Sequence, residues 1–447
     1  MKTRSSFVCQ QCGNETPQWM GKCPSCGEWN SLVETTRVTG RQVPSGKRQA
    51  SNGKLIQPQS LNQIKPIKTS RIPTGFSECD RVLGGGIVPG GVILVSGDPG
   101  VGKSTLLLSV LGKIGGWYVT GEESAEQVKL RADRLKIGYP STRSARSGNT
   151  ELSILPETNI ENILSAIEAA TNKPQVFVID SIQTMASDTL DGVAGSPGQI
   201  RQATQLLLRL AKEQHIAIFI VGHVTKEGTI AGPKLLEHMV DVVCYFEGER
   251  YYQGRMLRTL KNRFGPTDEV GIFEMGELGL TEISNPSKLF LEGRVKNVAG
   301  STVGVILEGT RPLLVEIQSL VVSSQLAMPR RVASGIDYNR LQVILAILQK
   351  RLNIPLGTFD VFVNVSGGLK LKEPAADLPV TLSLISAFKN KPLPASFASF
   401  GEVGLLGELR RVQGEEQRKK EAKRLGFTTI LSPQTFGTLE KASKELF

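Results

Sequence analysis

A glycine-rich segment near residue 100 has the residue types and the spacing that are needed to hold a nucleoside triphosphate. Glycines allow backbone N–H groups to come close to phosphate oxygens, beside the positive end of a helix. Lys103 can reach the β- and γ-phosphates, Ser104 can offer its hydroxyl to Mg²⁺, and Thr105 is placed on the α-phosphate side. We therefore expect ATP and Mg²⁺ as cofactors of this loop, which reads Gly97-Asp98-Pro99-Gly100-Val101-Gly102-Lys103-Ser104-Thr105.

Acidic residues that follow two apolar runs could complete a hydrolytic site. Asp180 ends the run at 176–179, where a carboxylate can hold Mg²⁺ directly or through water, although an Asp in this place can also simply open a turn. Glu122 and Glu123 come shortly after the run at 117–119. A carboxylate there can polarise the water that attacks the γ-phosphate. The alternative is that both glutamates only mark the start of a helix, which acidic side chains also favour.

The first 26 residues contain a second candidate site, built from four of the six cysteines. Two C-x-x-C pairs, separated by ten residues, can each hold one metal ion from a tight turn. In a reducing compartment, such clustering favours zinc over disulfides, and a closed four-sulfur site is structural rather than catalytic. We expect Cys79 and Cys244, outside the cluster, to be small buried residues. The predicted zinc ligands are Cys9, Cys12, Cys23 and Cys26.

Alternating strands and helices must position the phosphate loop and its carboxylates. Apolar runs at 92–95, 117–119, 176–179 and 216–221 indicate buried strands, and 106–111 and 199–213 indicate helices. This alternation is typical of an α/β fold, a parallel sheet with helices on both faces. After residue 287, a strand at 361–365 and a helix with apolar residues at helical spacing indicate a separate α+β domain. The helix carries Leu341, Ile344, Leu345, Leu348 and Leu352.

The chain of 447 residues is too long for one hydrophobic core, so we expect several domains. We predict a zinc module at 1–34, a flexible linker at 35–70, an ATPase domain at 71–280 and a C-terminal domain at 287–447. The linker has seven basic residues and no acidic one, which suits a solvated tether or a tether that contacts DNA.

The bulk properties narrow the partners and the compartment. The net charge of +11 favours nucleic acid or acidic lipid as a partner, although the same charge is compatible with a merely soluble basic protein. No apolar run is long enough to span a membrane, and cysteines stand where a signal peptide would need an apolar core. We therefore expect a cytoplasmic protein without a membrane partner.

Together these motifs resemble the bacterial RadA family, also called Sms, whose members are relatives of the RecA recombinase. The resemblance covers essentially the whole chain and includes Cys-Pro-Ser-Cys-Gly-Glu-Trp at 23–29 and the phosphate loop. Its most family-specific motif is Lys261-Asn262-Arg263-Phe264-Gly265. The resemblance implies an N-terminal zinc ribbon, a central RecA-like P-loop ATPase domain and a C-terminal Lon-protease-like domain.

The same resemblance implies a function in DNA repair and recombination. It implies a homo-oligomeric ring, a hexamer, that hydrolyses ATP in response to DNA and moves along single-stranded DNA. Such a ring would act on branched DNA, promote branch migration of recombination intermediates and cooperate with the RecA recombinase.

Four basic residues acquire expected contacts from the resemblance. Lys261 and Arg263 would act on the nucleotide of a neighbouring subunit or on DNA, and their chemistry permits both, or a solvated basic loop. Arg201 and Lys226 belong to segments at 195–201 and 223–228 that look like the two flexible DNA-facing loops of RecA-like rings. Glycine-rich loops with few cations suit a channel that grips a backbone, and ordinary surface turns are the alternative.

The C-terminal domain departs from the Lon pattern at the residues that would cleave a peptide bond. Lon-type cleavage uses a serine nucleophile and a lysine base, whereas segment 372–378 has alanine in place of the serine and segment 413–416 carries carboxylates. Without a nucleophile, covalent acyl transfer cannot begin. We expect an oligomerisation scaffold with a candidate DNA-binding surface formed by Arg410, Arg411, Arg418, Lys419 and Lys420.

Two other activities compete with the DNA motor. An ATP-gated DNA clamp would bind nucleotide and barely hydrolyse it, so sustained ATP hydrolysis would exclude it. An ATP-dependent peptidase would cleave casein, but the missing nucleophile argues against this activity.

Overall fold

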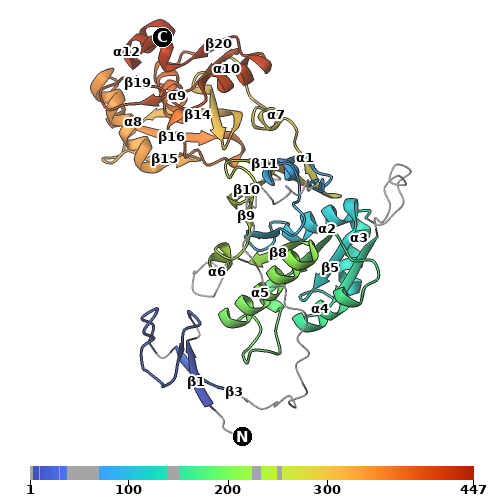
Figure 1. The fold of residues 1–447 in the computed structure, drawn as a ribbon. Helices are drawn as coiled ribbons and strands as arrows, with labels where there is room; N and C mark the ends of the chain where they lie inside the picture. The colour runs from blue at the N-terminus through green and yellow to red at the C-terminus, as the bar shows by residue number, and fades with distance from the viewer. Residues whose placement is uncertain are drawn as a thin grey trace, which may run out of the picture. The chain divides into compact units, whose positions relative to one another are not determined.

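The computed structural model describes residues 4–9, 11–29, 31–37, 70–137, 151–223, 233–248 and 254–447 (Figure 1). The chain forms two compact units. The first consists of Met1–Glu247, Leu257–Thr267 and Met275–Leu280, and the second of Gly248–Met256, Asp268–Glu274 and Thr281–Phe447.

The cysteine-rich segment forms a small antiparallel sheet. Its strands β1 (Arg4–Cys9), β2 (Glu15–Thr16) and β3 (Leu32–Arg37) have the order β2-β1-β3. Cys9 at the end of β1 pairs with Leu32 at the start of β3, and both are buried together with Cys23. This cluster is too small to stabilise a fold by apolar burial alone, so the segment depends on a further cross-link such as a metal ion.

A nine-stranded sheet contains six parallel strands, and these six form the centre of the first unit. The strand order is β12-β11-β10-β9-β4-β8-β7-β5-β6. The six parallel strands are β4 (Val92–Gly97), β5 (Gly116–Thr120), β6 (Leu152–Pro156), β7 (Val176–Asp180), β8 (Ala217–His223) and β9 (Val242–Glu247). The remaining three are β10 (Gly254–Asn262), β11 (Val270–Gly276) and β12 (Gly279–Glu282).

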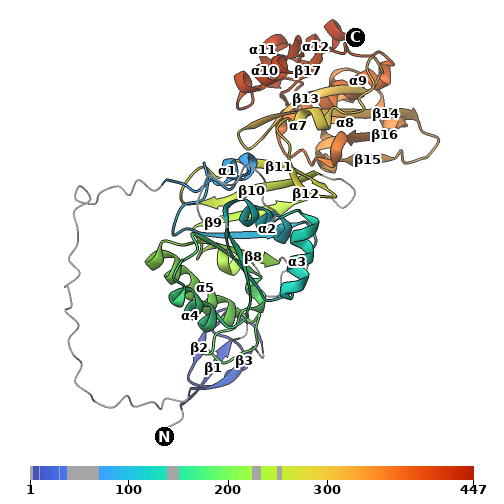
Figure 2. The same cartoon turned by 90° about the vertical axis from the view of Figure 1, so that its right-hand side faces the viewer.

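Helices cover both faces of the parallel part, as the sequence predicts (Figures 1 and 2). One face packs on α4 (Ile160–Ala169) and α5 (Pro197–Gln214), where Ile163 and Leu207 meet Leu94 in one buried cluster. The other face carries α2 (Lys103–Ile114) and α3 (Ala125–Arg134). Central strands such as β4 and β7 are buried along their whole length, which explains their unbroken apolar sequences. The first unit also contains α1 (Ser77–Val82) and α6 (Pro233–Glu237).

The second unit is built on a six-stranded mixed sheet, which confirms the predicted α+β pattern. The strand order is β15-β16-β14-β13-β17-β20. These strands are β13 (Ser301–Glu308), β14 (Arg311–Ser323), β15 (Arg331–Ser334), β16 (Phe359–Val365), β17 (Phe397–Ser399) and β20 (Thr429–Leu431). A short hairpin consists of β18 (Glu402–Val403) and β19 (Leu409–Arg410).

Two helices contribute most to the core of this second unit. The first ten residues of α9 (Asp377–Lys389) are all buried. Helix α8 (Tyr338–Arg351) buries Leu341, Ile344 and Leu348 against the same core, as its periodicity predicts. The other helices are α7 (Pro286–Phe290), α10 (Glu415–Arg424), α11 (Pro433–Phe436) and α12 (Leu439–Leu446). Across the described ranges, no helix combines the length and the apolar character needed to cross a membrane.

Candidate functional site

The phosphate loop connects the buried strand β4 to helix α2 at the carboxyl edge of the parallel sheet. Helix α2 begins at Lys103, so the free N–H groups of its first turn and those of the loop face the same space. Gly97 has a φ of 150°, and a Cβ there would lie 2.1 Å from the carbonyl oxygen of Phe246. The close approach of β4 to β9 therefore excludes any side chain at this point of the loop.

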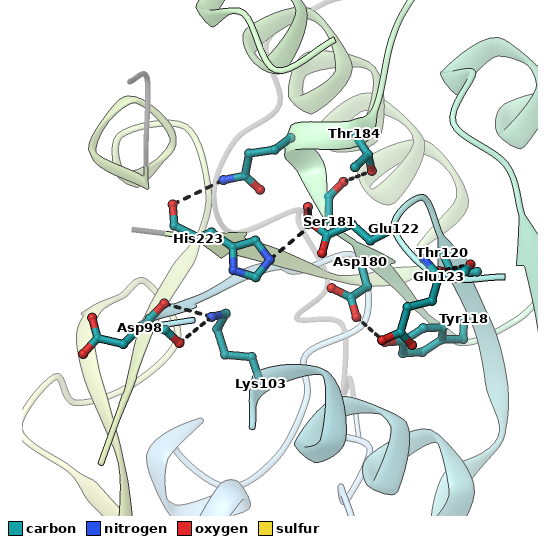
Figure 3. Close-up of polar contacts among 12 residues, drawn as sticks. Asp98, Lys103, Tyr118, Thr120, Glu122, Glu123, Asp180, Ser181, Thr184 and His223 are labelled. Carbon is teal, nitrogen blue, oxygen red and sulfur yellow. Dashed lines mark hydrogen bonds and ion pairs between the residues drawn. The ribbon is translucent and has the colours of Figure 1, made fainter. Parts of the chain in front are cut away.

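Lys103 holds its ammonium group inside the loop. The side chain is buried, and Nζ donates hydrogen bonds to the carbonyl oxygens of Gly97 at 2.8 Å and Asp98 at 3.0 Å (Figure 3). Burial lowers the pKa of Lys103, and the nearby carboxylates of Asp180, Asp98 and Glu122 act in the opposite direction. A partly desolvated ammonium group on a glycine-rich loop has the position and the charge to bind phosphate oxygens.

Asp180 ends strand β7, buried at the same edge of the sheet. The hydroxyl group of Tyr118, on the neighbouring strand β5, donates a hydrogen bond to Asp180 Oδ2 (Figure 3). Burial, and then the negative charge of Asp180, raise the pKa of Tyr118 well above its usual value, so this phenol stays protonated and remains a donor. This hydrogen bond orients the carboxylate of Asp180. Tyr118 could not be recognised from the sequence, because a tyrosine inside an apolar run belongs to no motif.

The structure separates the two glutamates that follow β5. Glu122 accepts a hydrogen bond from Ser181 Oγ, directly after Asp180, and its Oε1 lies 3.3 Å from His223 Nε2 (Figure 3). Glu123 instead forms an ion pair with Arg131 of helix α3. The structure thus brings Glu122, but not the carboxylate of Glu123, together with the residues next to Asp180.

The helix start that follows these glutamates has its own cap. Ser124 accepts a hydrogen bond from the backbone N–H of Gln127, and the side chain of Gln127 accepts one from the Ser124 N–H, which makes a capping box. Neither Glu122 nor Glu123 is needed to start α3. A helix-start role therefore does not account for Glu122.

His223 is a second residue that the sequence analysis did not assign to the nucleotide site. It ends β8 and pairs in register with Gly97 of the phosphate loop. Its backbone carbonyl accepts a hydrogen bond from Gln183 Nε2 at 3.4 Å. Strand order explains the convergence, because β4, β8, β7 and β5 are neighbours whose carboxyl ends carry the phosphate loop, His223, Asp180 and Glu122 in turn.

The interpretation of the basic motif as a solvated loop is wrong, because Lys261 and Arg263 do not lie together in a loop. Lys261 belongs to strand β10, and its Nζ donates to the carbonyl oxygens of Glu237 at 2.7 Å and Val240 at 2.8 Å. Burial and the charge of Arg263 lower the pKa of Lys261. Carbonyl groups at and just after the end of α6 therefore hold the lysine on its strand, and the turn at 263–265 begins after the strand ends at Asn262.

Asp241 anchors the arginine of this motif. Its side chain is almost fully buried, with Oδ1 3.3 Å from Arg263 Nη1 and Oδ2 2.6 Å from Lys212 Nζ. Asp241 Oδ2 also accepts the backbone N–H of Val92, at the first residue of β4. One carboxylate thus connects the basic motif, helix α5 and the strand that leads into the phosphate loop.

The residues expected in the two DNA-facing loops have different outcomes. Arg201 is exposed, but residues 197–201 form the start of helix α5, so only 195 and 196 of the expected loop precede the helix. The expectation of a loop at Arg201 is therefore wrong, because Pro197 at the first helical position favours helix initiation. Lys226 and most of the second segment lie outside the described residues.

The four cysteines fit a zinc ion. Their Sγ atoms all lie within 4.8 Å of one another, with 3.6 Å between Cys9 and Cys26 and 3.5 Å between Cys12 and Cys23. Four ligands at a Zn–S distance of about 2.3 Å would place the sulfurs about 3.8 Å apart in a tetrahedron. The module therefore has the donor set and the spacing of a closed structural zinc site.

In the second unit, both alanines of segment 372–378, which is expected to correspond to the Lon nucleophile, are buried, whereas Lys372 is exposed. Ala375 is fully buried with Phe400 and Ala422, so its position offers neither a nucleophile nor access to solvent. Arg418 was expected on a DNA-binding surface, and this expectation is wrong. Its guanidinium is completely buried, forms an ion pair with Glu373 and donates to the carbonyl oxygen of Val305 at 2.6 Å.

The other four basic residues of that expected surface lie at least partly in solvent, and two of them have acidic partners. Arg410 pairs with Glu408 at 2.6 Å, and Lys419 lies 3.2 Å from Glu416. Arg411 and Lys420 are exposed. The local charge of this region is therefore partly neutralised.

Family models match three ranges of the chain. Residues 7–34 match the rubredoxin metal binding domain, residues 72–269 match the KaiC ATPase family, and residues 333–435 match subunit ChlI of Mg-chelatase. Among solved structures, the ATPase domain of G40P gives a TM-score of 0.39 at 14% identity over 48% of this chain and 92% of that one. The RadB recombinase gives 0.37 at 20% identity over 47% of this chain and 99% of that one.

Full-length relatives are much closer in sequence. The protein named DNA repair protein RadA from Bacillus subtilis is 49% identical over 97% of this chain and 93% of its own length. The protein of the same name from Listeria monocytogenes is 48% identical over 97% of this chain and 93% of its own length. That from Synechocystis is 46% identical over 100% of this chain and 92% of its own length.

Proposed function

Because this chain belongs to the bacterial RadA family of DNA repair proteins, we propose that it is a DNA-dependent ATPase that moves along DNA. It would process recombination intermediates by driving branch migration on single-stranded and branched DNA. The observation that carries the proposal is the convergence of Lys103, Glu122 and Asp180 at one edge of the sheet. Such a site can hold a triphosphate and activate water, which is the chemistry of an ATP-driven motor.

Each residue of the nucleotide site has a distinct proposed role. Backbone N–H groups of 97–105 and the ammonium of Lys103 bind the phosphates. The Ser104 hydroxyl and the Asp180 carboxylate, oriented by Tyr118, would hold Mg²⁺, which neutralises charge on the phosphate oxygens. Glu122 polarises the attacking water once it exchanges its present hydrogen bond with Ser181 for one to that water.

The basic motif has a role that needs a second subunit or DNA. Lys261 donates a hydrogen bond to a backbone carbonyl group, and Arg263 forms an ion pair with Asp241. Neither of these contacts involves the phosphate loop that Lys103 occupies. We propose that both residues of the motif act either on the nucleotide of a neighbouring subunit in a ring or on DNA, and the Arg263→Ala experiment described below distinguishes the two. Arg201 and Lys226 would contact the DNA backbone. A hexameric ring, cooperation with the RecA recombinase and domain limits at 34, 70 and 280 belong to the same proposal.

The proposal is tested by steady-state ATP hydrolysis with and without single-stranded DNA, on the full chain with Mg²⁺. Lys103→Ala should abolish turnover, because no other described side chain places an ammonium on the loop. Lys129→Ala is the matched control, since Lys129 is an exposed lysine paired with Asp133 on helix α3. Arg263→Ala should lower turnover without removing nucleotide binding if it acts in trans, and should lower DNA affinity if it acts on DNA.

Two results would contradict the motor. Turnover that is identical with and without single-stranded and branched DNA would remove the DNA dependence. Tight DNA and nucleotide binding without hydrolysis above background would instead describe an ATP-gated clamp.

A further inference from the structure

The guanidinium group of Arg263 is loosely held in the basic motif. Its Nη1 lies 3.3 Å from Asp241 Oδ1, and the side chain is 56% exposed. The backbone of the same turn is fixed by other contacts. The Arg263 N–H donates to the carbonyl oxygen of Asp241 at 3.1 Å, and the carbonyl oxygen of Phe264 accepts from Arg71 Nη2 at 2.6 Å. The guanidinium group can therefore turn toward another anion while the turn keeps its shape.

Lys212 is the closer cation of the two that pair with Asp241. Its ammonium group, in the last turn of α5, lies 2.6 Å from Asp241 Oδ2, the oxygen that also accepts the N–H of Val92. The Asp241 side chain is only 4% exposed, so its charge needs a nearby cation at all times. The Lys212 ammonium also lies 5.8 Å from the centre of the Phe264 ring, a second favourable contact. Asp241 therefore stays paired when the guanidinium of Arg263 moves away.

The charges around Arg263 favour a phosphate group as its new partner. Burial, and then the charge of Arg263, lower the pKa of Lys261, while the charges of Asp241 and Glu237 raise it. Together with Lys212, three cations thus share two carboxylates, and the cluster keeps an excess of positive charge. A planar guanidinium group binds phosphate oxygens through paired hydrogen bonds. The proposed function supplies such a phosphate, either in DNA or in the nucleotide of a neighbouring subunit.

We propose that Lys212 is a positioning residue for Arg263, because it neutralises Asp241 and so allows the guanidinium group to leave for a phosphate group. Without this ammonium group, the buried carboxylate would depend on Arg263 and would hold it in place. The inference rests on the proposed function and deepens it, since it adds a residue that controls the basic motif. Lys212 belongs to no motif in the sequence, and only the fold brings it to Asp241.

The test measures ATP hydrolysis with and without DNA, and the affinity for fluorescein-labelled oligothymidylate, on the full-length protein with Mg²⁺. Arg263→Ala first identifies which quantity depends on the guanidinium group: turnover if the phosphate belongs to a nucleotide, affinity if it belongs to DNA. Lys212→Met should lower the same quantity by about tenfold, because Asp241 then holds Arg263 more tightly. Lys129→Met is the matched control, since Lys129 is an exposed lysine paired with Asp133, and it should change neither quantity.

A second substitution separates positioning from direct contact with the phosphate. Asp241→Asn removes the charge that holds Arg263 and keeps an acceptor for the N–H of Val92. The double variant Lys212→Met with Asp241→Asn should therefore recover to within about threefold of the parent protein. If Lys212 itself contacts the phosphate, or if its loss merely distorts the fold, the defect of Lys212→Met persists in the double variant. Either result overturns the inference.

The outcomes distinguish this inference from the proposed function. If ATP hydrolysis by the parent protein does not respond to DNA, the proposed function fails. If Arg263→Ala leaves both turnover and DNA affinity unchanged, the role of the basic motif fails, and the inference fails with it. If Arg263→Ala lowers one of these quantities and Lys212→Met lowers neither, the proposed function stands and only the role of Lys212 is refuted.

Discussion

Substituting Glu122 and Glu123 separately, each by glutamine, tests the central chemical assignment of the nucleotide site. The two residues are adjacent in sequence and identical in type, and glutamine keeps their size while removing the charge. The structure nevertheless gives them different surroundings. Glu122 meets Ser181 and His223, whereas Glu123 is paired with Arg131. A difference in ATP hydrolysis between the two variants therefore results from the different surroundings of the two glutamates, since the chemical change is the same in both.

The expected magnitudes follow from these surroundings. A positioned general base typically contributes about 100- to 10,000-fold to rate, so Glu122→Gln should lower kcat by that factor. The Glu123–Arg131 pair is partly open to solvent, with side chains 33% and 18% exposed. Losing such a pair costs about 1 kcal/mol of stability or less, so Glu123→Gln should keep kcat within a few-fold of the parent protein.

The assay combines single-turnover ATP hydrolysis with binding of a fluorescent ATP analogue. Both variants should bind the analogue with affinity close to that of the parent protein, because Lys103 and the loop N–H groups are untouched. If Glu122→Gln lowers the rate of ATP hydrolysis by less than about tenfold, the loss is smaller than the range expected for a general base, and the role of Glu122 is refuted. Equal defects in both variants would show that the structural separation of the two carboxylates has no catalytic meaning.

Two further predictions concern groups that the structure buries. Asp241→Ala should destabilise the protein by about 1–3 kcal/mol more than Asp241→Asn, because only asparagine keeps an acceptor for the buried N–H of Val92. Urea unfolding followed by circular dichroism measures this difference, and equal unfolding midpoints for the two variants would contradict the prediction. Arg418→Met should cost about 3 kcal/mol or more, because it leaves the Glu373 carboxylate without its buried partner. Arg424→Met, at an exposed ion pair, should change stability by about 0.5 kcal/mol at most, and a similar loss in both variants would argue against the buried pair.

The exposed and buried cations of the second unit show why residue type alone is a poor guide to a binding surface. The run 418–420 reads as a basic patch in the sequence. In helix α10, however, successive residues point in different directions, so Arg418 faces the core while Lys420 faces solvent. The sequence could have suggested this, because Ala422, four residues after Arg418, lies on the same buried face.

Two parts of the site could be read from the sequence because their geometry is local. The phosphate loop spans nine consecutive residues between a strand and a helix, so chain connectivity itself brings its amides and Lys103 together. Each C-x-x-C pair likewise closes a turn within four residues. Strands β4 and β7 could also be recognised, because burial on both faces of a parallel sheet demands unbroken apolar runs.

Tertiary structure alone decided the contacts between distant residues. Tyr118 and Asp180 are 62 positions apart and meet only because β5 and β7 are neighbours in register. The choice of Glu122 over Glu123 depends on a serine and an arginine contributed by other elements. A sequence states which groups are present, but strand order and side-chain packing determine which of them come within hydrogen-bonding distance, and these depend on the whole folded chain.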